Sequence, residues 1–185
     1  FGRGNGNFLL YDMNIAVFAS GTGTTLQALI DQQTNYGYKV TLLVANRECP
    51  AIERAQNHGI RILQSKDWEQ IDKTLNINDI NLIVLAGFLA IIPEWLCTKW
   101  DKRIINTHPS LLPKFGGKGM YGMHVHEAVW KAGEKMTGCT VHYVSAEIDS
   151  GSIIAQSVVE VKESDTPNTI AQRVQAAEKV LLPRV

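Results

Sequence analysis

Short apolar runs alternate with segments of helical periodicity over the first two-thirds of this chain. The first run, Asn14 to Ala19, breaks into a turn at 20–25, after which Leu26 and Leu29 recur at helical spacing. The most hydrophobic run, Asn81 to Gly87, has the length and composition of a buried strand. This alternation is typical of parallel strands whose connecting helices cover both faces of one sheet.

The same criteria give the rest of the expected order. Further strands are expected at Val40–Ala45, Ile60–Leu63, Arg103–Asn106, Thr140–Val144 and Ser152–Val161. Helices are expected at Ala51–His58, Trp68–Leu75 and His126–Ala132, and from Pro167 onward. The last two strands follow each other after a short turn, so we expect an antiparallel edge near the C-terminus. The predicted fold is α/β, with a Rossmann-like open, mostly parallel sheet flanked by helices.

Domain organisation follows from the same pattern. Residues 1–12 are rich in Gly and Asn and show no period, so we interpret them as a flexible extension. Residues 13–185 have a length that suits one domain.

Charge and cysteine usage narrow the classes of partner. The chain has 18 basic and 18 acidic residues, which argues against a nucleic-acid or membrane partner held by general electrostatics. Its longest apolar run, Leu82 to Ile92, has 11 residues, against about 20 for a membrane span. Cys49, Cys97 and Cys139 are too scattered for a disulfide framework or a zinc site. We expect a cytoplasmic protein that binds small molecules, as a monomer or a homodimer.

The turn at 20–25 lies where a strand passes into a helix. This geometry presents free backbone N–H groups to an anion such as a phosphate. The turn lacks the third glycine of a dinucleotide fingerprint and the lysine of a P-loop. From the residues alone, a plain connection and a phosphate site both remain open.

A strand ends abruptly in Asn106 and His108, and two prolines and two glycines follow within the next nine residues. Side chains two positions apart on a strand share a face, so an amide and an imidazole point the same way. Two such donors suit a developing oxyanion. A polar strand end followed by a proline-rich turn is the alternative interpretation.

Glycines are dense in the segment that follows. Four of them lie between Gly116 and Gly122, so we predict that Phe115 to His126 is a mobile lid. His124 and His126 have a spacing found in metal sites, but no carboxylate or cysteine pattern completes one. We therefore expect no metal.

Two more segments have a structural and a functional interpretation. The run 88–93 follows the most hydrophobic strand, where α/β sheets bind ligands, or it packs in the core. Asp149-Ser-Gly lies between two strands and is compatible with an ordinary hairpin turn.

The motif Asn-Thr-His-Pro-Ser-Leu-Leu-Pro at 106–113 closely resembles that of folate-dependent formyltransferases, and within them the glycinamide ribonucleotide (GAR) transformylases. The resemblance extends from about Met13 to the last residue. It implies transfer of a formyl group from 10-formyltetrahydrofolate, as co-substrate, to the amine of GAR in de novo purine biosynthesis.

The resemblance also implies roles for individual residues. Asn106 and protonated His108 would stabilise the oxyanion, and His108 would protonate the leaving folate nitrogen. Asp149, in a segment similar to the family's aspartate loop, would keep His108 charged and help remove protons from the amine through water.

The resemblance also implies which residues bind the two substrates, from their positions in the chain. The GAR phosphate would lie at Gly23, Thr24 and Thr25, and Gln175 and Glu178 would contact the ribose and glycinamide. The folate would lie against Leu89, Ala90, Ile91, Ile92, Ala146 and Glu147. The family commonly has Asn where this chain has Thr25, and often Arg where it has Ala90.

Three alternatives stay open. Methionyl-tRNA formyltransferase shares the core motif but usually adds a C-terminal domain and a basic surface, which these 185 residues do not show. Formyltetrahydrofolate deformylase normally carries an N-terminal regulatory domain, also not expected here. A non-catalytic nucleotide-binding module would use the strand-turn-helix site alone.

Overall fold

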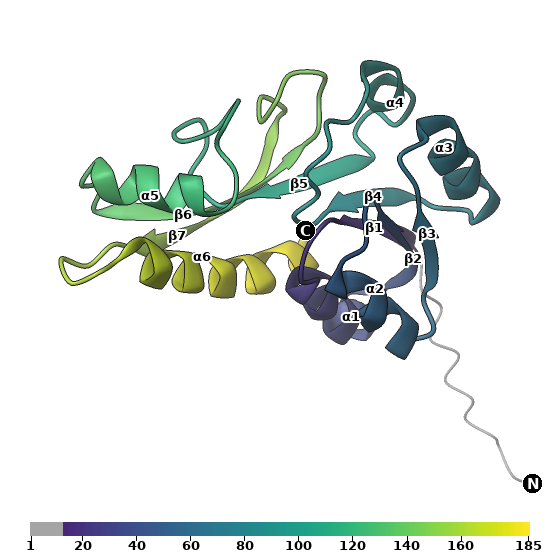
Figure 1. Ribbon diagram of the computed structural model, residues 1–185, viewed down its shortest axis with the longest axis horizontal. Coiled ribbons are helices and arrows are strands. Elements are labelled where there is room, and N and C mark those ends of the chain that lie inside the picture. Colours follow the sequence, from purple (N-terminus) through teal and green to yellow (C-terminus); the bar gives the residue numbers. More distant parts are fainter. Residues whose placement is uncertain (1–12) are drawn as a thin grey trace, which may run out of the picture.

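The computed structural model describes residues 13–185, and the proposed extension at 1–12 lies outside the described residues. Within the described part, seven strands form one sheet in the order β3-β2-β1-β4-β5-β6-β7 (Figure 1). The strands are β1 Met13–Ala19, β2 Tyr38–Ala45, β3 Arg61–Gln64, β4 Leu82–Leu85, β5 Ile104–His108, β6 Met136–Tyr143 and β7 Ile153–Glu160. The helices are α1 Thr24–Tyr36, α2 Pro50–Asn57, α3 Trp68–Ile77, α4 Glu94–Lys99, α5 Met123–Lys131 and α6 Pro167–Leu181, followed by the 3₁₀-helix η1 Leu182–Arg184.

The sheet is parallel on one side and antiparallel on the other. Strands β1 to β5 pair in parallel, whereas β6 runs antiparallel to β5 and β7 antiparallel to β6. The predicted Rossmann-like sheet with an antiparallel edge is therefore confirmed. Strand order reverses at β1, whose neighbours are β2 and β4, and ligands of such sheets bind outside the carboxyl ends of the strands at this point.

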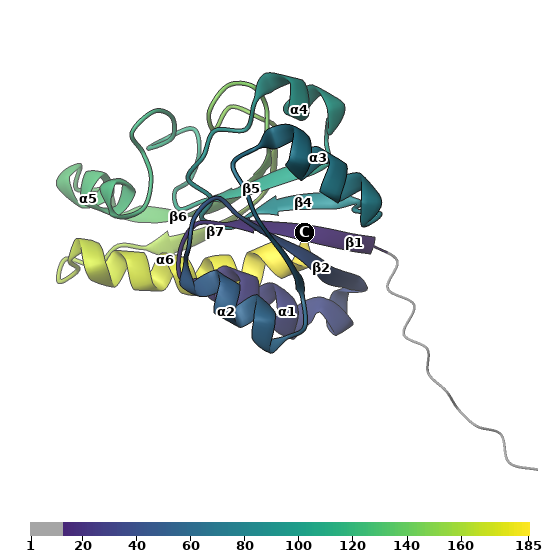
Figure 2. The same cartoon turned by 45° about the vertical axis from the view of Figure 1, so that its right-hand side comes forward.

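Helices cover both faces of the parallel part. Figure 2 shows α1 and α2 on one side and α3 and α4 on the other. Val17 packs toward the first pair and its neighbour Phe18 toward the second, as the alternation of a strand requires. Phe18 is fully buried, and removing such a ring costs about 3–5 kcal/mol.

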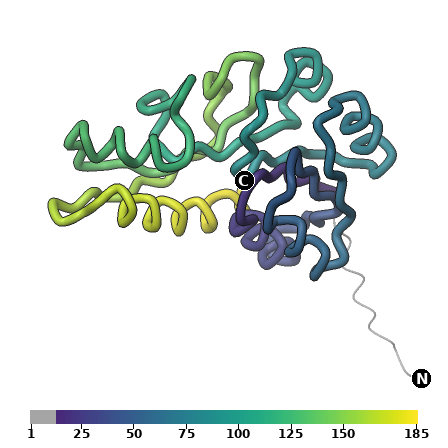
Figure 3. The backbone as a smooth tube through the Cα atoms, in the orientation of Figure 1, coloured from purple at the N-terminus to yellow at the C-terminus, as the bar shows by residue number. Residues whose placement is uncertain are grey.

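The antiparallel part projects from this body with two helices of its own (Figures 1 and 3). Helix α6 lies along β6 and β7 and packs Ile170 and Val174 against Cys139 and Val159. It begins at Pro167, as predicted, after the N-cap residue Thr166, whose side chain accepts a hydrogen bond from the backbone N–H of Thr169.

Most of the boundaries stated above lie within about two residues of the observed ones, and three elements differ more from the expectation. Helix α4 was not predicted, because six residues are too few to show a period. Helix α5 begins three residues before His126. Strand β6 begins four residues before Thr140, because Gly138 looks like a turn residue in sequence. In the structure Gly138 allows close approach of β7: a Cβ there would lie 1.9 Å from the carbonyl oxygen of Ser157.

In the part of the chain described here, no helix has both the length and the apolar character needed to cross a membrane.

Candidate active site

A cavity of about 760 Å³ opens at the carboxyl ends of β1, β4 and β5. The turn after β1, the loop after β4, the end of β5, the segment before α5, the β6–β7 loop and α6 all contribute to its walls. Its lining residues include those predicted for the phosphate, catalytic and folate positions: Gly23, Thr24, Thr25, Leu89, Ala90, Ile91, Ile92, Asn106, His108, Ala146, Glu147, Asp149, Gln175 and Glu178. The structure thus brings every predicted site residue to one cavity.

The turn after β1 forms one end of this cavity. Gly23 has a φ of 71° and directly precedes α1, and a Cβ at this position would lie 2.8 Å from the Cα of Ala51. Only glycine combines this backbone conformation with such a close approach. No side chain of the described residues caps α1, so its first N–H groups remain available to an anion in the cavity.

The same end carries a carboxyl group that is easily protonated. Thr25 Oγ1 donates a hydrogen bond of 3.1 Å to Glu178 Oε1, which ties the turn to α6. Burial raises the pKa of Glu178 to about 7, against which the hydrogen bond from Thr25 acts. Glu178 therefore changes its charge near neutral pH.

The loop after β4 forms another wall of the cavity. Phe88 anchors it by edge contacts with the rings of Phe18 and Trp68, and the backbone N–H of Leu89 donates to Ser20 Oγ at 3.0 Å. Leu89 and Ile91 remain exposed. Exposed apolar side chains at a cavity wall suit a flat heterocycle.

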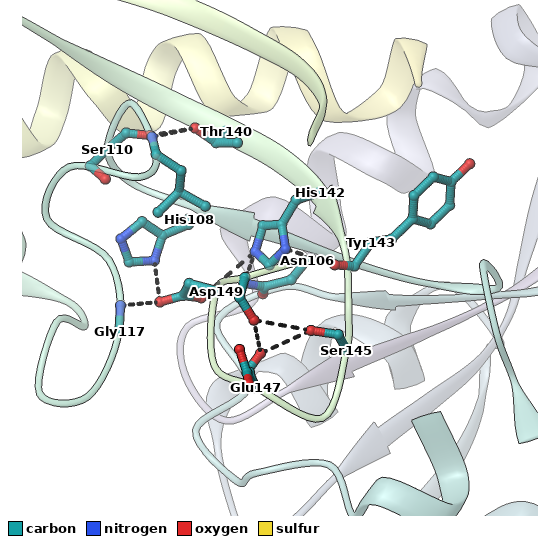
Figure 4. A network of polar contacts seen from close by, with 12 residues as sticks. Asn106, His108, Ser110, Gly117, Thr140, His142, Tyr143, Ser145, Glu147 and Asp149 are labelled. Carbon is teal, nitrogen blue, oxygen red and sulfur yellow. Dashed lines mark hydrogen bonds and ion pairs between the residues drawn. The ribbon is translucent and has the colours of Figure 1, made fainter. Parts of the chain in front are cut away.

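Asn106 and His108 lie at the end of β5, and Asp149 reaches them from the β6–β7 loop (Figure 4). His108 Nδ1 lies 3.4 Å from Asp149 Oδ2, and both side chains are nearly buried. His108 Nε2 lies 2.8 Å from the carbonyl oxygen of Phe115. With an acceptor at each ring nitrogen, the protonated imidazole is the form that satisfies both.

Asp149 is held by the backbone as well as by histidine. Its φ is 53°, a conformation that Asp and Asn tolerate better than most residues. The backbone N–H of Gly117 donates to its Oδ2 at 2.9 Å, so the carboxylate joins the segment before α5 to the β6–β7 loop.

His142, which was not among the predicted residues, orients Asn106. The two residues face each other in the register of β5 and β6. Burial, with the charge of His108, lowers the pKa of His142, so its ring is neutral near pH 7. The ring donates from Nδ1 to the carbonyl oxygen of Tyr143 at 2.9 Å and accepts from Asn106 Nδ2 at 3.1 Å. The signal in the sequence was the alternation Val-His-Tyr-Val, which places a histidine on one face of a strand next to the aspartate loop.

Thr140 fixes the turn that follows His108. Its hydroxyl donates to the carbonyl oxygen of Ser110 at 2.7 Å and accepts from the backbone N–H of Leu112 at 3.1 Å and from Gln156 at 2.9 Å. Figure 4 shows Thr140 beside Ser110. A single buried hydroxyl thus satisfies three groups of the proline-rich turn and β7.

The two histidines of the segment 115–126 lie in different environments. His124 is exposed, with its ring centroid 5.1 Å from that of Tyr121. His126 is buried and lines the cavity. Within residues 13–185, no cluster of three or more His, Cys, Asp or Glu residues could hold a metal ion.

Comparison with known proteins agrees with this geometry. The formyl transferase family model matches residues 13–185. A chloroplastic phosphoribosylglycinamide formyltransferase of Arabidopsis thaliana is 38% identical over 184 residues. The protein of that name from Bacillus subtilis (strain 168) is 36% identical over 182 residues. The crystal structure of phosphoribosylglycinamide formyltransferase from Anaplasma phagocytophilum has a TM-score of 0.87 at 38% identity, covering 93% of this chain and 84% of that one.

The coverage of these relatives varies. The Arabidopsis alignment covers 92% of this chain but 63% of that protein, and the Bacillus alignment covers 92% and 91%. The chain spans less than a fifth of the trifunctional purine biosynthetic proteins that it also matches. The matched family model, the shared fold and the residues gathered at the end of β5 together show that this chain belongs to the formyl transferase family.

Proposed function

We propose that residues 13–185 form one formyltransferase domain, which transfers the formyl group of 10-formyltetrahydrofolate to the amine of GAR in de novo purine biosynthesis. The observation that carries this proposal is the convergence of Asn106, His108 and Asp149 in a cavity whose walls also include the glycine turn before α1. Relatives with similar sequences over most of this chain carry the name of this activity.

The reaction starts with attack of the GAR amine on the formyl carbon, which gives a tetrahedral intermediate with a negatively charged oxygen. Asn106 uses one of its two amide hydrogens on His142, so the other is free to donate to this oxygen. A fixed donor costs no reorganisation during the reaction, which is why it stabilises the transition state.

His108 supplies the proton for the leaving folate nitrogen. In the structure its Nε2 faces the carbonyl oxygen of Phe115, so this bond has to be exchanged before the ring can donate to substrate. Phe115 opens the glycine-rich segment predicted as a lid. Movement of this lid would therefore decide when the acid becomes available.

Asp149 holds His108 in place and favours its charged form through the contact at Nδ1. Its carboxylate is also the nearest group that could take protons from the attacking amine through a water molecule. These two roles make it part of the general acid–base machinery.

The two substrates would occupy different parts of the cavity. Gly23, Thr24 and Thr25 would hold the GAR phosphate, while Gln175 and Glu178 on α6 would contact its ribose and glycinamide. The pterin would lie against 89–92, Ala146 and Glu147. The Thr25 hydroxyl still donates a hydrogen bond, although here it is directed to Glu178. At Ala90 only backbone groups could form hydrogen bonds with the pterin.

In this proposal 10-formyltetrahydrofolate is the co-substrate, and no step requires a metal ion. The partners are small molecules, with neither nucleic acid nor membrane required, and the chain acts as a monomer or a homodimer. Cys49, Cys97 and Cys139 are buried free thiols, which suits a reducing compartment such as the cytoplasm.

An absorbance assay of folate product, run with and without GAR, tests the proposal. Turnover that depends on GAR is expected. Turnover that ignores GAR would show a deformylase, and binding of GAR without turnover would show a nucleotide-binding module. Formylation of methionyl-tRNA in preference to GAR would move the chain to the third alternative.

A further inference from the structure

His126 is a buried polar side chain to which the proposed mechanism gives no task. It lies on α5, is 3% exposed and lines the cavity. Its Nδ1 is enclosed by protein and has no hydrogen-bond partner among the described residues. Its Nε2 also has no hydrogen bond there but is not among the enclosed atoms, so Nε2 is the nitrogen that opens on the cavity.

This environment decides the form of the ring. Burial, and next the charge of His108, lower the pKa of His126, so the ring is neutral near pH 7. A buried N–H without an acceptor is rarer in proteins than an unsatisfied acceptor, so the single proton belongs on Nε2. His126 therefore presents an uncharged donor to the cavity.

The location of His126 indicates which part of a substrate it meets. The charge of His108 acts on it directly, and α5 packs against α6, which carries Gln175 and Glu178. In the proposed function the attacking amine lies at His108 and the ribose at α6. The segment that joins them is the glycinamide, whose carbonyl oxygen is its strong hydrogen-bond acceptor.

We propose that Nε2–H of His126 donates a hydrogen bond to the amide carbonyl oxygen of the glycinamide, and that this contact aligns the amine with the formyl carbon. The inference rests on the proposed function and adds a residue to it. A neutral donor suits this place because a second cation beside His108 would oppose the protonation that His108 needs.

Two substitutions of His126 distinguish a hydrogen bond made by Nε2 from one made by Nδ1. His126→Gln places an amide N–H near the position of Nε2, whereas His126→Asn places one near Nδ1. We expect His126→Asn to lower kcat/KM for GAR about 10-fold, as loss of one hydrogen bond does, with KM for folate unchanged. His126→Gln should stay within about threefold of the parent protein. His124→Asn, on the same segment but exposed, is the matched control and should change neither constant.

A modified substrate tests the contact from the other side. In a carbocyclic GAR analogue with CH₂ in place of the amide carbonyl, the parent protein and His126→Asn should show the same kcat/KM, since the bond is missing in both. Equal losses in the Asn and Gln variants, or an unchanged 10-fold loss with the analogue, would overturn the inference.

Failure of the proposed function would look different. In that case the parent protein would not formylate GAR at all. Calorimetric affinities of GAR and the analogue for the parent, Asn and Gln proteins would still test the contact. A loss of affinity confined to the Asn variant and to GAR is the expected result, and equal affinities in all three proteins contradict it.

Discussion

The proposed phosphate site and the proposed catalytic site are built from different materials. At the proposed phosphate site, the turn at Gly23 offers backbone N–H groups at the start of α1, with no side-chain cap among the described residues. At the proposed catalytic site, Asn106, His108, His142 and Asp149 are held by one another and by backbone carbonyl and N–H groups.

This difference determines which substitutions each of the two sites should tolerate. A backbone site depends on chain conformation, so it accepts changes such as Thr25 in place of the family's Asn but no bulk at Gly23. A buried network depends on the identity of each side chain, because every removed partner leaves another group unsatisfied in a low dielectric. Four predictions test the contrast, in order of expected effect.

Asp149→Asn should have the largest effect. The amide keeps the size of the side chain and tolerates the positive φ, but it removes the charge that faces His108. We expect kcat to fall about 10²- to 10⁴-fold, with KM for GAR changed little. Glu163→Gln, exposed and not among the residues that line the cavity, is the control. Steady-state kinetics with a fall in kcat of less than threefold would remove Asp149 from the acid–base machinery.

Gly23→Ala should mainly damage phosphate binding. Its Cβ would clash with Ala51, and the turn would have to shift its N–H groups. Loss of one hydrogen bond to a charged group predicts a KM for GAR about 10- to 100-fold higher, with KM for folate unchanged. Gly21→Ala is the matched control, since a Cβ there meets nothing within 4 Å. Similar increases for both substrates would place the phosphate elsewhere.

Thr140→Val should lower the free energy of unfolding by about 1–3 kcal/mol, because Ser110 and Leu112 lose their partner in a buried turn. Denaturant unfolding measures the change. Thr137→Val is the control: its hydroxyl is buried without a partner among the described residues, so its loss should cost little or stabilise. Equal losses in the two variants would contradict the role of the Thr140 network.

Glu178 should give the smallest effect, visible as a pH dependence. With a pKa of about 7, about a tenth of the carboxyl is ionised at pH 6 and about nine-tenths at pH 8. The ionised form accepts hydrogen bonds from ribose hydroxyls, so KM for GAR should fall as pH rises, by at most about tenfold. GAR itself also titrates in this range, and comparison with Glu178→Gln removes that contribution. Identical pH profiles for the two proteins would exclude Glu178 from ribose binding.

Much of the molecule follows from the order of residues. The apolar run before the glycine turn, the alternation with helical segments and the short turn between the last two strands predicted the sheet and its antiparallel edge, because these features depend on near neighbours in the chain. The motif at 106–113 located the strand that carries the proposed catalytic residues. The structure gathers the proposed site residues in one cavity, while their roles stay predictions.

Other features depend on contacts between distant segments. Gly138 belongs to a strand only because β7 passes within reach of it. His142 faces Asn106 only because β6 pairs antiparallel with β5 in that register, and the form of the His126 ring depends on its burial where α5 packs against the rest of the fold. By itself the sequence determined the local elements and the residues suited to formyl transfer. The tertiary structure decided which polar groups share a partner and which remain neutral, because register and burial arise from packing between segments far apart in the chain.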